Sequence, residues 1–243
     1  MVTLILAAGY ATRLYPLSLQ TPKALFSVRN APVIEHILRK TEALPDSSVY
    51  VITNNKFYSQ FLAWSEVVGK GRVRIVNDGT NSESERLGAI GDIGFFLRTT
   101  RLDEDVLIIG GDNLFDWQLT DFVAYARQKN GVPVIGLFDV GDREHASSLG
   151  VVTIDRKGQV TAFIEKPKDP PSTLTSVCIY FFPRQTLKYV AEYIAENPAA
   201  DTSGEFIRWL SARIPVYAHE FRGSWFDIGN KKTLEEAQTK FGR

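Results

Sequence analysis

A run of small residues followed by two cations stands near the start of the chain and could bind phosphate. The apolar stretch from Val2 to Leu6 leads into Ala7-Ala8-Gly9-Tyr10-Ala11-Thr12-Arg13, and Thr21-Pro22-Lys23 follows. Small residues let backbone N–H groups approach a phosphate closely, and the two cations neutralise its oxygens. This pattern indicates a nucleoside triphosphate site, with nucleotide-binding residues Leu6, Ala8, Gly9, Tyr10, Ala11 and Thr12 and catalytic residues Arg13 and Lys23.

A second candidate site follows the apolar stretch that ends at Ile109, where Gly110-Gly111-Asp112-Asn113 stands. In an open parallel sheet, ligands gather at the carboxyl ends of the strands. A carboxylate there is well placed to hold Mg²⁺, a hard cation that prefers oxygen ligands and keeps several waters. Gly-Asp-Asn is also good turn chemistry. The preceding buried strand and the opening loop together favour Asp112 as a metal ligand.

Composition limits the classes of partner. Lys plus Arg and Asp plus Glu each number 28, so no global field attracts nucleic acid or a membrane surface. One cysteine excludes an internal disulfide framework and a Cys-rich zinc site. The first apolar run is too short to span a bilayer and poorly built as a signal peptide. We therefore expect a cytoplasmic protein with no nucleic-acid or membrane partner, and homo-oligomerisation stays open.

Strand-like and helix-like segments alternate along the chain. Continuous Val/Ile/Leu runs are typical of strands buried on both faces, and they predict strands at 2–7, 48–53, 73–76, 105–109, 132–138, 151–154, 160–164, 175–182 and 216–220. Apolar residues at helical spacing predict helices over 33–41, around 122–126, after a capping box at 202–205, and over about 230–241 with Asn230 as cap.

This alternation predicts an α/β fold with a doubly wound, mainly parallel, Rossmann-like sheet flanked by helices. The strands between about 150 and 182 follow one another closely, which indicates a small antiparallel lid lobe. We expect a single domain over 1–243, with a nucleotide-binding lobe at about 1–140, a second lobe at about 141–220 and the C-terminal helix at about 230–241.

The opening loop resembles the signature of a known enzyme family. The order Ala-Ala-Gly-x-x-Thr-Arg-Leu-x-Pro-Leu, and then Pro-Lys, is similar to that of the sugar-1-phosphate nucleotidylyltransferases, which include glucose-1-phosphate thymidylyltransferase and mannose-1-phosphate guanylyltransferase. The resemblance implies a fold of the nucleotide-diphospho-sugar transferase type. It also implies Mg²⁺-dependent transfer of a nucleoside monophosphate from an NTP to a sugar 1-phosphate, which releases pyrophosphate.

One residue of the signature departs from the family. The usual sequence has glycine where Ala11 stands. Alanine approaches a phosphate nearly as closely only if its φ is negative.

The resemblance also assigns residues farther along the chain. Asp112 matches the metal-binding Asp of a Gly-Asp-Asn motif. Asp227, in Trp225-Phe226-Asp227-Ile228-Gly229, matches the second metal ligand, while Asn230 replaces the usual Thr. Gly88 is the best match, by its distance from Asp112, to a glycine that helps to recognise the base.

The second lobe carries the residues that the resemblance assigns to the sugar phosphate. Glu165 matches a residue that binds sugar hydroxyls, and Lys166 matches one that binds the phosphate. A carboxylate accepts hydrogen bonds from neighbouring hydroxyls, and an ammonium group is a compact partner for a phosphate monoester. Gly150 belongs to a segment that faces the sugar, in which Leu149 replaces the family's Tyr.

Two other functions stay open. The changed Leu149 allows a nucleotidylyltransferase that acts on a non-sugar phosphate or phosphonate, such as phosphocholine. A non-catalytic nucleotide-sensing module would keep the fold, but such modules tend to lose the cations or metal carboxylates, which are all present here. The sequence does not determine the base, the acceptor or the oligomeric state.

Overall fold

Two interleaved units make up the chain in the computed structural model, which describes residues 1–44, 48–69, 71–198 and 201–242. Unit 1 comprises Met1–Gly88, Ile109–Leu119 and Gly223–Arg243, and unit 2 comprises Ala89–Ile108 and Thr120–Arg222. The predicted lobe boundaries near 140 and 220 stay a prediction.

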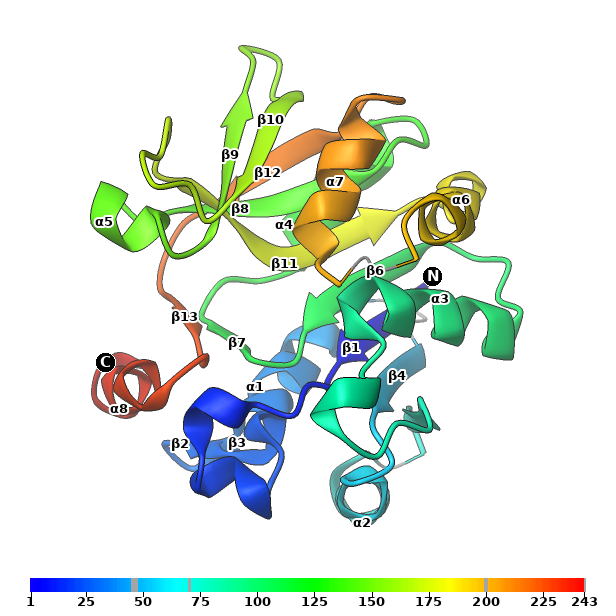
Figure 1. Ribbon diagram of the computed structural model, residues 1–243, viewed down its shortest axis with the longest axis vertical. Helices are drawn as coiled ribbons and strands as arrows, with labels where there is room; N and C mark the ends of the chain where they lie inside the picture. The colour runs from blue at the N-terminus through cyan, green and yellow to red at the C-terminus, as the bar shows by residue number, and fades with distance from the viewer. Residues whose placement is uncertain (45–47, 70, 199–200, 243) are drawn as a thin grey trace. The chain divides into compact units, whose positions relative to one another are not determined.

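Unit 1 is built on three parallel strands. Strand β1 (Val2–Leu6) pairs with β4 (Ser48–Thr53), which pairs with β5 (Val73–Asn77). Helices α1 (Val33–Thr41) and α2 (Tyr58–Val68) connect them, and α2 packs against β5 (Figure 1). Because the strands are parallel, the loops that follow them emerge at one edge.

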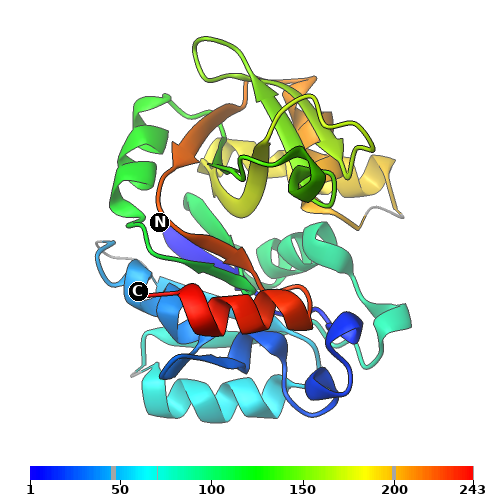
Figure 2. The same cartoon turned by 90° about the vertical axis from the view of Figure 1, so that its left-hand side faces the viewer.

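Short strands and a helix complete unit 1. β2 (Ser27–Val28) pairs with β3 (Ala31–Pro32), and β7 (Asn113–Phe115) pairs antiparallel with β13 (Trp225–Asp227). The C-terminal helix α8 (Lys231–Lys240) packs beside β2, and Figure 2 shows it in red next to the blue N-terminal segments. The guanidinium of Arg29 donates to backbone carbonyls at the end of α8. The last part of the chain is thereby held to its beginning.

Unit 2 contains the antiparallel strands. β9 (Gly150–Ile154) pairs antiparallel with β10 (Val160–Glu165) and with β11 (Leu174–Phe182), and β11 pairs antiparallel with β8 (Val134–Asp139). β12 (Tyr217–Phe221) lies parallel to β8. β6 (Val106–Gly110) is buried throughout and crosses from unit 2 to unit 1 within its length.

The helices of unit 2 have between 4 and 13 residues. They are α3 (Gly88–Thr100, whose first residue belongs to unit 1), α4 (Thr120–Gln128), α5 (Arg143–Ala146), α6 (Lys188–Glu196) and α7 (Ser203–Ser211). Helix α7 packs on β10 and buries Phe206, Ile207 and Leu210. The Thr202 side chain accepts from the Glu205 N–H, which is one half of the predicted capping box. Single 3₁₀ turns lie at Thr12–Leu14, Leu17–Leu19, Lys23–Leu25, Glu83–Glu85 and Arg184–Thr186.

The nine predicted strands and four predicted helices are all confirmed, with small shifts at their ends. Asn230 caps α8 in a full capping box with Thr233. The sequence did not predict α2, α3, α5, α6 or the four strands of two or three residues. In the described part of the chain, no helix is both long and apolar enough to cross a membrane.

Ala11 adopts the left-handed conformation that normally requires glycine. Its φ is 51° and its ψ is 45°, so it does not have the negative φ that suits alanine. The hydroxyl of Ser18 donates to the Ala11 carbonyl at 2.6 Å and helps to hold this geometry. The glycine of the usual signature therefore has a conformational reason, and this chain keeps the conformation without the glycine.

Replacing Ala11 with glycine should stabilise the protein. Left-handed alanine costs about 1–2 kcal/mol, whereas glycine adds about 0.5–1 kcal/mol of backbone entropy loss, so we expect Ala11→Gly to raise the unfolding free energy by about 0.5–1 kcal/mol. Urea denaturation measures it. Ala63→Gly, at an exposed position of α2, is the matched control and should cost about 1 kcal/mol. A loss of stability in Ala11→Gly would contradict this account.

Candidate active site

The opening loop is held by β4 and by the segment that follows it in unit 1. The Ala7 N–H donates to the Ile52 carbonyl at 2.9 Å, which extends the parallel pairing past the end of β1. The fully buried Asn54 then donates its side-chain N–H to the Ala8 carbonyl at 2.8 Å. The first bond uses the N–H of Ala7, and beyond Ala7 the loop is held through the Ala8 carbonyl.

The N–H side of the same loop is left for a ligand. Among the described residues, no backbone N–H from Ala8 to Thr12 donates a hydrogen bond. A methyl group added at Gly9 would meet nothing within 4 Å, so the space beside it is open. Successive N–H groups without partners at a strand end form an anion-binding concavity. This loop can therefore bind a phosphate, and the phosphate site stays a prediction.

Four predicted charged residues lie together in unit 1, three of them around the Asp227 carboxylate. The Lys23 ammonium lies 2.5 Å from the Asp112 carboxylate, and each of these side chains is about one quarter exposed (24% and 26%). Asp227 interacts electrostatically with Asp112, Lys23 and Arg13. Its carboxyl group is close enough to that of Asp112 for a hydrogen bond between them. These four residues lie far apart in the sequence, from position 13 to position 227. The structure brings them together.

Two short strands place the carboxylates side by side. Asp227 ends β13 opposite Asn113 of β7, and the Ile228 N–H donates to the Asp112 carbonyl at 3.0 Å. The Trp225 indole N–H donates to the Asn113 side-chain oxygen at 2.6 Å, and the Asn113 amide donates to the Gly110 carbonyl. The amide of Asn113 therefore fixes the turn between β6 and β7, on which Asp112 lies.

Gly111 allows this turn to approach β1 closely. Its N–H donates to the Leu6 carbonyl at 2.8 Å, and a Cβ at this position would lie 2.6 Å from the same oxygen. Any side chain would push the Asp112 turn away from the opening loop. The sequence shows Gly111 in the motif, but only the close contact reveals what it does.

Burial and a neighbouring carboxylate change the acidity of Asp227. Desolvation, followed by repulsion from Asp112, raises the pKa of Asp227 to about 6, although Lys23 and Arg13 act in the opposite direction. Two carboxylates kept close at this cost favour a cation between them.

The donor set fits a hard divalent cation. Among the described residues, no group of three or more His, Cys, Asp and Glu side chains converges. Mg²⁺ is usually held by one or two carboxylates together with waters and substrate phosphates rather than by an all-protein cage. The pair Asp112 and Asp227 therefore suits Mg²⁺ and does not suit a structural zinc site.

A second group of predicted residues lies in unit 2. Glu165 stands opposite Gly150 in the β9–β10 pair, and the Lys166 ammonium lies 3.7 Å from the Glu165 carboxylate. Lys166 has a φ of 46°, which turns the chain sharply at the strand end, and its N–H donates to the Leu149 carbonyl. Strained non-glycine residues cluster at ligand sites. Gly150, Glu165 and Lys166 thus form one group.

Gly204, which sequence reasoning missed, encloses the Glu165 carboxylate. A Cβ on Gly204 would lie 2.8 Å from that carboxylate and 2.5 Å from the Phe163 ring, and one on Gly150 would meet the same two side chains. Two glycines therefore clear the space in which Glu165 lies. The sequence signal that could have revealed Gly204 is a glycine in the first turn of an amphipathic helix.

Gly88 begins α3 with a φ of 72°, a conformation that favours glycine. Its predicted contact with the base stays a prediction.

Leu6, another of the predicted nucleotide-binding residues, contributes its carbonyl to the contact with Gly111.

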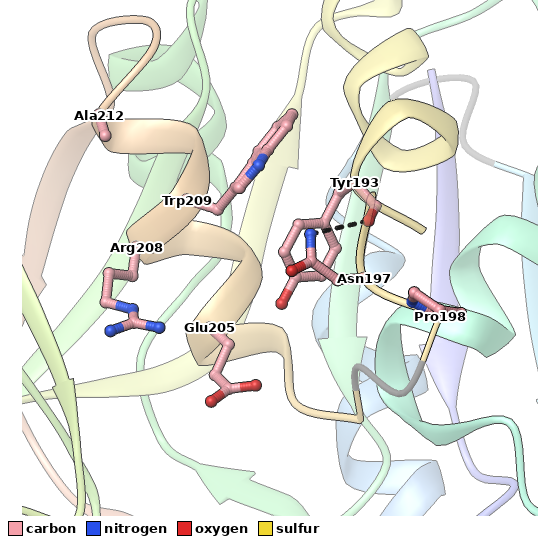
Figure 3. Close-up of a pocket in the computed structure, with 7 residues that line it drawn as sticks. All are labelled: Tyr193, Asn197, Pro198, Glu205, Arg208, Trp209 and Ala212. Atoms are coloured by element: carbon pink, nitrogen blue, oxygen red, sulfur yellow. Dashed lines mark hydrogen bonds between the residues drawn. The ribbon is translucent and has the colours of Figure 1, made fainter. Parts of the chain in front are cut away.

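A separate cavity lies between α6 and α7 within unit 2 (Figure 3). It has a volume of about 570 Å³ and contains none of the predicted site residues. Its lining residues are Tyr193, Asn197, Pro198, Glu205, Arg208, Trp209 and Ala212. The Asn197 side chain donates to the Tyr193 carbonyl, which closes α6.

The sequence model of the nucleotidyl transferase family matches residues 2–242 of the chain. The chain belongs to this family. Membership confirms the resemblance seen in the opening loop, and with it the prediction of an enzyme that transfers nucleotidyl groups.

Two curated relatives are bifunctional GlmU proteins. The chain is 25% identical to that of Methanococcus aeolicus and 26% identical to that of Methanocaldococcus jannaschii, with 98% of the chain covered in both. It covers 54% and 53% of these proteins, so the chain spans about half the length of the curated relatives it matches.

Solved structures confirm the fold. A protein of Bacillus anthracis assigned as a glucose-1-phosphate thymidylyltransferase, in complex with sucrose, matches with a TM-score of 0.85 and 22% identity over 100% of this chain and 98% of that one. A UDP-glucose pyrophosphorylase bound to UDP-glucose matches with a TM-score of 0.83 and 18% identity over 99% and 97%. The predicted α/β fold of the nucleotide-diphospho-sugar transferase type is thus confirmed.

The Asp227 environment predicts a pH-dependent effect of Asp227→Asn on the metal-free protein. The folded pKa of about 6 lies above the ordinary 3.8, so ionised Asp227 lowers stability above about pH 6 and has no effect below about pH 4. We expect the variant to gain up to about 3 kcal/mol at pH 7.5, and nothing at pH 4. Urea denaturation in EDTA measures both. The exposed Glu66→Gln is the control, and a gain independent of pH would contradict repulsion as the cause.

Proposed function

We propose that this enzyme transfers a nucleoside monophosphate from an NTP to a sugar 1-phosphate and releases pyrophosphate. The convergence of Arg13, Lys23, Asp112 and Asp227 carries the proposal, because these groups are suited to a triphosphate with its metal ion. The names of the relatives support the sugar phosphate, since they include a UDP-glucose pyrophosphorylase in complex with UDP-glucose.

The reaction is a direct displacement at the α-phosphorus. A phosphate oxygen of the acceptor forms the new bond, and the bond from the α-phosphorus to the oxygen that bridges to the β-phosphorus breaks. The acceptor phosphate is already an anion at neutral pH, so no general base is needed. The protein must align two polyanions and neutralise charge as it develops. Arg13 and Lys23 serve the triphosphate and the leaving pyrophosphate.

Asp112 and Asp227 would hold Mg²⁺. When bound there, the ion supplies Lewis-acid stabilisation and a template for the phosphates. Lys23 pairs with Asp112 in the structure, and its ammonium group would stand beside this ion to serve the phosphate oxygens. Arg13 is exposed and can reach ligand from the start.

Unit 2 provides the proposed acceptor site. Glu165 accepts hydrogen bonds from acceptor hydroxyls, and Lys166 pairs with the acceptor phosphate. Both side chains are accessible, with 33% and 52% exposure. The cytoplasmic location predicted from the sequence would supply both substrates.

A grid of triphosphates against acceptors tests the function. Each of dTTP, UTP, GTP and CTP is combined with several sugar 1-phosphates, phosphocholine and a phosphonate, with Mg²⁺, and pyrophosphate release is followed. We expect turnover with at least one sugar 1-phosphate. Turnover with phosphocholine or the phosphonate alone would replace the sugar acceptor by the alternative. Triphosphate binding without turnover for any acceptor would favour a sensing module.

Lys166→Ala should separate the two substrates. Loss of the ammonium group removes a charge-assisted contact with the acceptor phosphate, so we expect the KM for the sugar phosphate to rise about tenfold or more while the KM for the NTP changes little. Steady-state kinetics measure both. Lys168→Ala, two residues on and also exposed, is the control. Equal effects on both substrates would show that the assignment of Lys166 is wrong.

Asp112→Asn should remove most of the metal-dependent turnover while the protein stays folded. We expect a loss of about 100-fold or more in kcat, because one carboxylate ligand is lost and Lys23 loses its partner. Turnover is measured over a Mg²⁺ series, with Glu66→Gln as the control and circular dichroism as the check on folding. Undiminished turnover would exclude Asp112 as a ligand.

A further inference from the structure

The side chain of Tyr10 lies inside the protein although its backbone belongs to the phosphate-binding loop. Only 3% of Tyr10 is exposed, whereas its neighbour Gly9 is exposed. The Tyr10 hydroxyl lies 3.1 Å from the hydroxyl oxygen of Thr80, in the loop that follows β5. A residue of the proposed ligand site is thus anchored through its side chain.

The hydrogen bonds of this anchor have a defined direction. The Thr80 hydroxyl and the Thr80 N–H both donate to one carboxylate oxygen of the buried Asp78, at 2.9 and 2.7 Å. A hydroxyl has one proton, so the Thr80 oxygen can only accept from Tyr10. Burial, with the nearby carboxylate of Asp78, raises the pKa of Tyr10, which keeps its proton for donation. The chain runs from Tyr10 through Thr80 to Asp78.

The receiving end of this chain is tied to the parallel sheet. The Asp78 N–H donates to the Thr53 carbonyl at 2.9 Å, and the Asn55 N–H donates to the Thr80 carbonyl at 2.9 Å. The loop after β5 is therefore joined to the end of β4. Asn54, next to Asn55, holds the Ala8 carbonyl. The phosphate-binding loop is consequently braced on both sides of Gly9.

We propose that Tyr10 is a positioning residue for the triphosphate: its hydroxyl, through Thr80 and Asp78, holds the loop from Ala8 to Thr12 in the ligand-ready form. This proposal rests on the proposed function of that loop. The five N–H groups are held open before a ligand arrives, so the ordering cost of binding is lowered. Tyr10 touches the ligand with its backbone only and acts through the fixed loop.

Tyr10→Phe tests the proposal, because it removes one oxygen and keeps the buried ring. Binding of inorganic tripolyphosphate is measured by calorimetry, and amide exchange of residues 8–12 is followed without ligand. We expect binding about five- to tenfold weaker, as for one lost hydrogen bond, and faster exchange in the loop. In turnover, the KM for the NTP should rise and that for the acceptor should not. Tyr58→Phe, on α2 of the same unit, should match the wild type.

Thr80 provides the second arm of the test. Thr80→Ser keeps the hydroxyl and should behave as the wild type, whereas Thr80→Val should resemble Tyr10→Phe. Should Thr80→Val fail to fold, the comparison of Thr80→Ser with Tyr10→Phe still decides. Unchanged binding and exchange in Tyr10→Phe would overturn the proposal and leave the function intact. A wild-type protein that binds no tripolyphosphate would overturn both.

Discussion

The repulsion between the carboxylates of Asp112 and Asp227 is the constraint on which the rest of unit 1 depends. Two such groups separate in water, and here a pair of short strands prevents it. The Lys23 ammonium compensates part of the charge. The arrangement of the two carboxylates thus lowers the stability of the ligand-free protein, and it becomes favourable when a cation and a polyanion bind.

Close backbone approach makes this arrangement feasible. Gly111 brings the turn after β6 against the end of β1, which places Asp112 beside the opening loop. The left-handed Ala11 and the anchored Tyr10 also fix the opening loop, and neither covers the N–H groups of that loop. In unit 2, Gly150 and Gly204 play the corresponding role around Glu165. Glycines at close contacts therefore shape both groups, and the buried Tyr10 side chain anchors the opening loop.

The sequence was sufficient for the elements with strong patterns. Buried strands such as β6 read as continuous apolar runs, and Thr202 and Asn230 marked two helix starts. Helices with weaker amphipathic patterns, such as α2 and α3, were missed because apolar residues occur on more than one face. The charged residues of the site were found from motif order. The contacts of Tyr10 and Gly204 were not, because they depend on pairing between segments far apart in the sequence.

The order of the segments in unit 1 has a consequence for biosynthesis. Asp112 lies in a short return of the chain to unit 1, and Asp227 arrives only after all of unit 2 has been made. A ribosome delivers the N-terminal part first, and domains generally fold as units during synthesis. The parallel strands β1, β4 and β5 can pair early, but β7 must wait for β13. A nascent chain would therefore hold the phosphate-binding loop long before it holds a complete pair of carboxylates, and it would become competent only after β13 has been made.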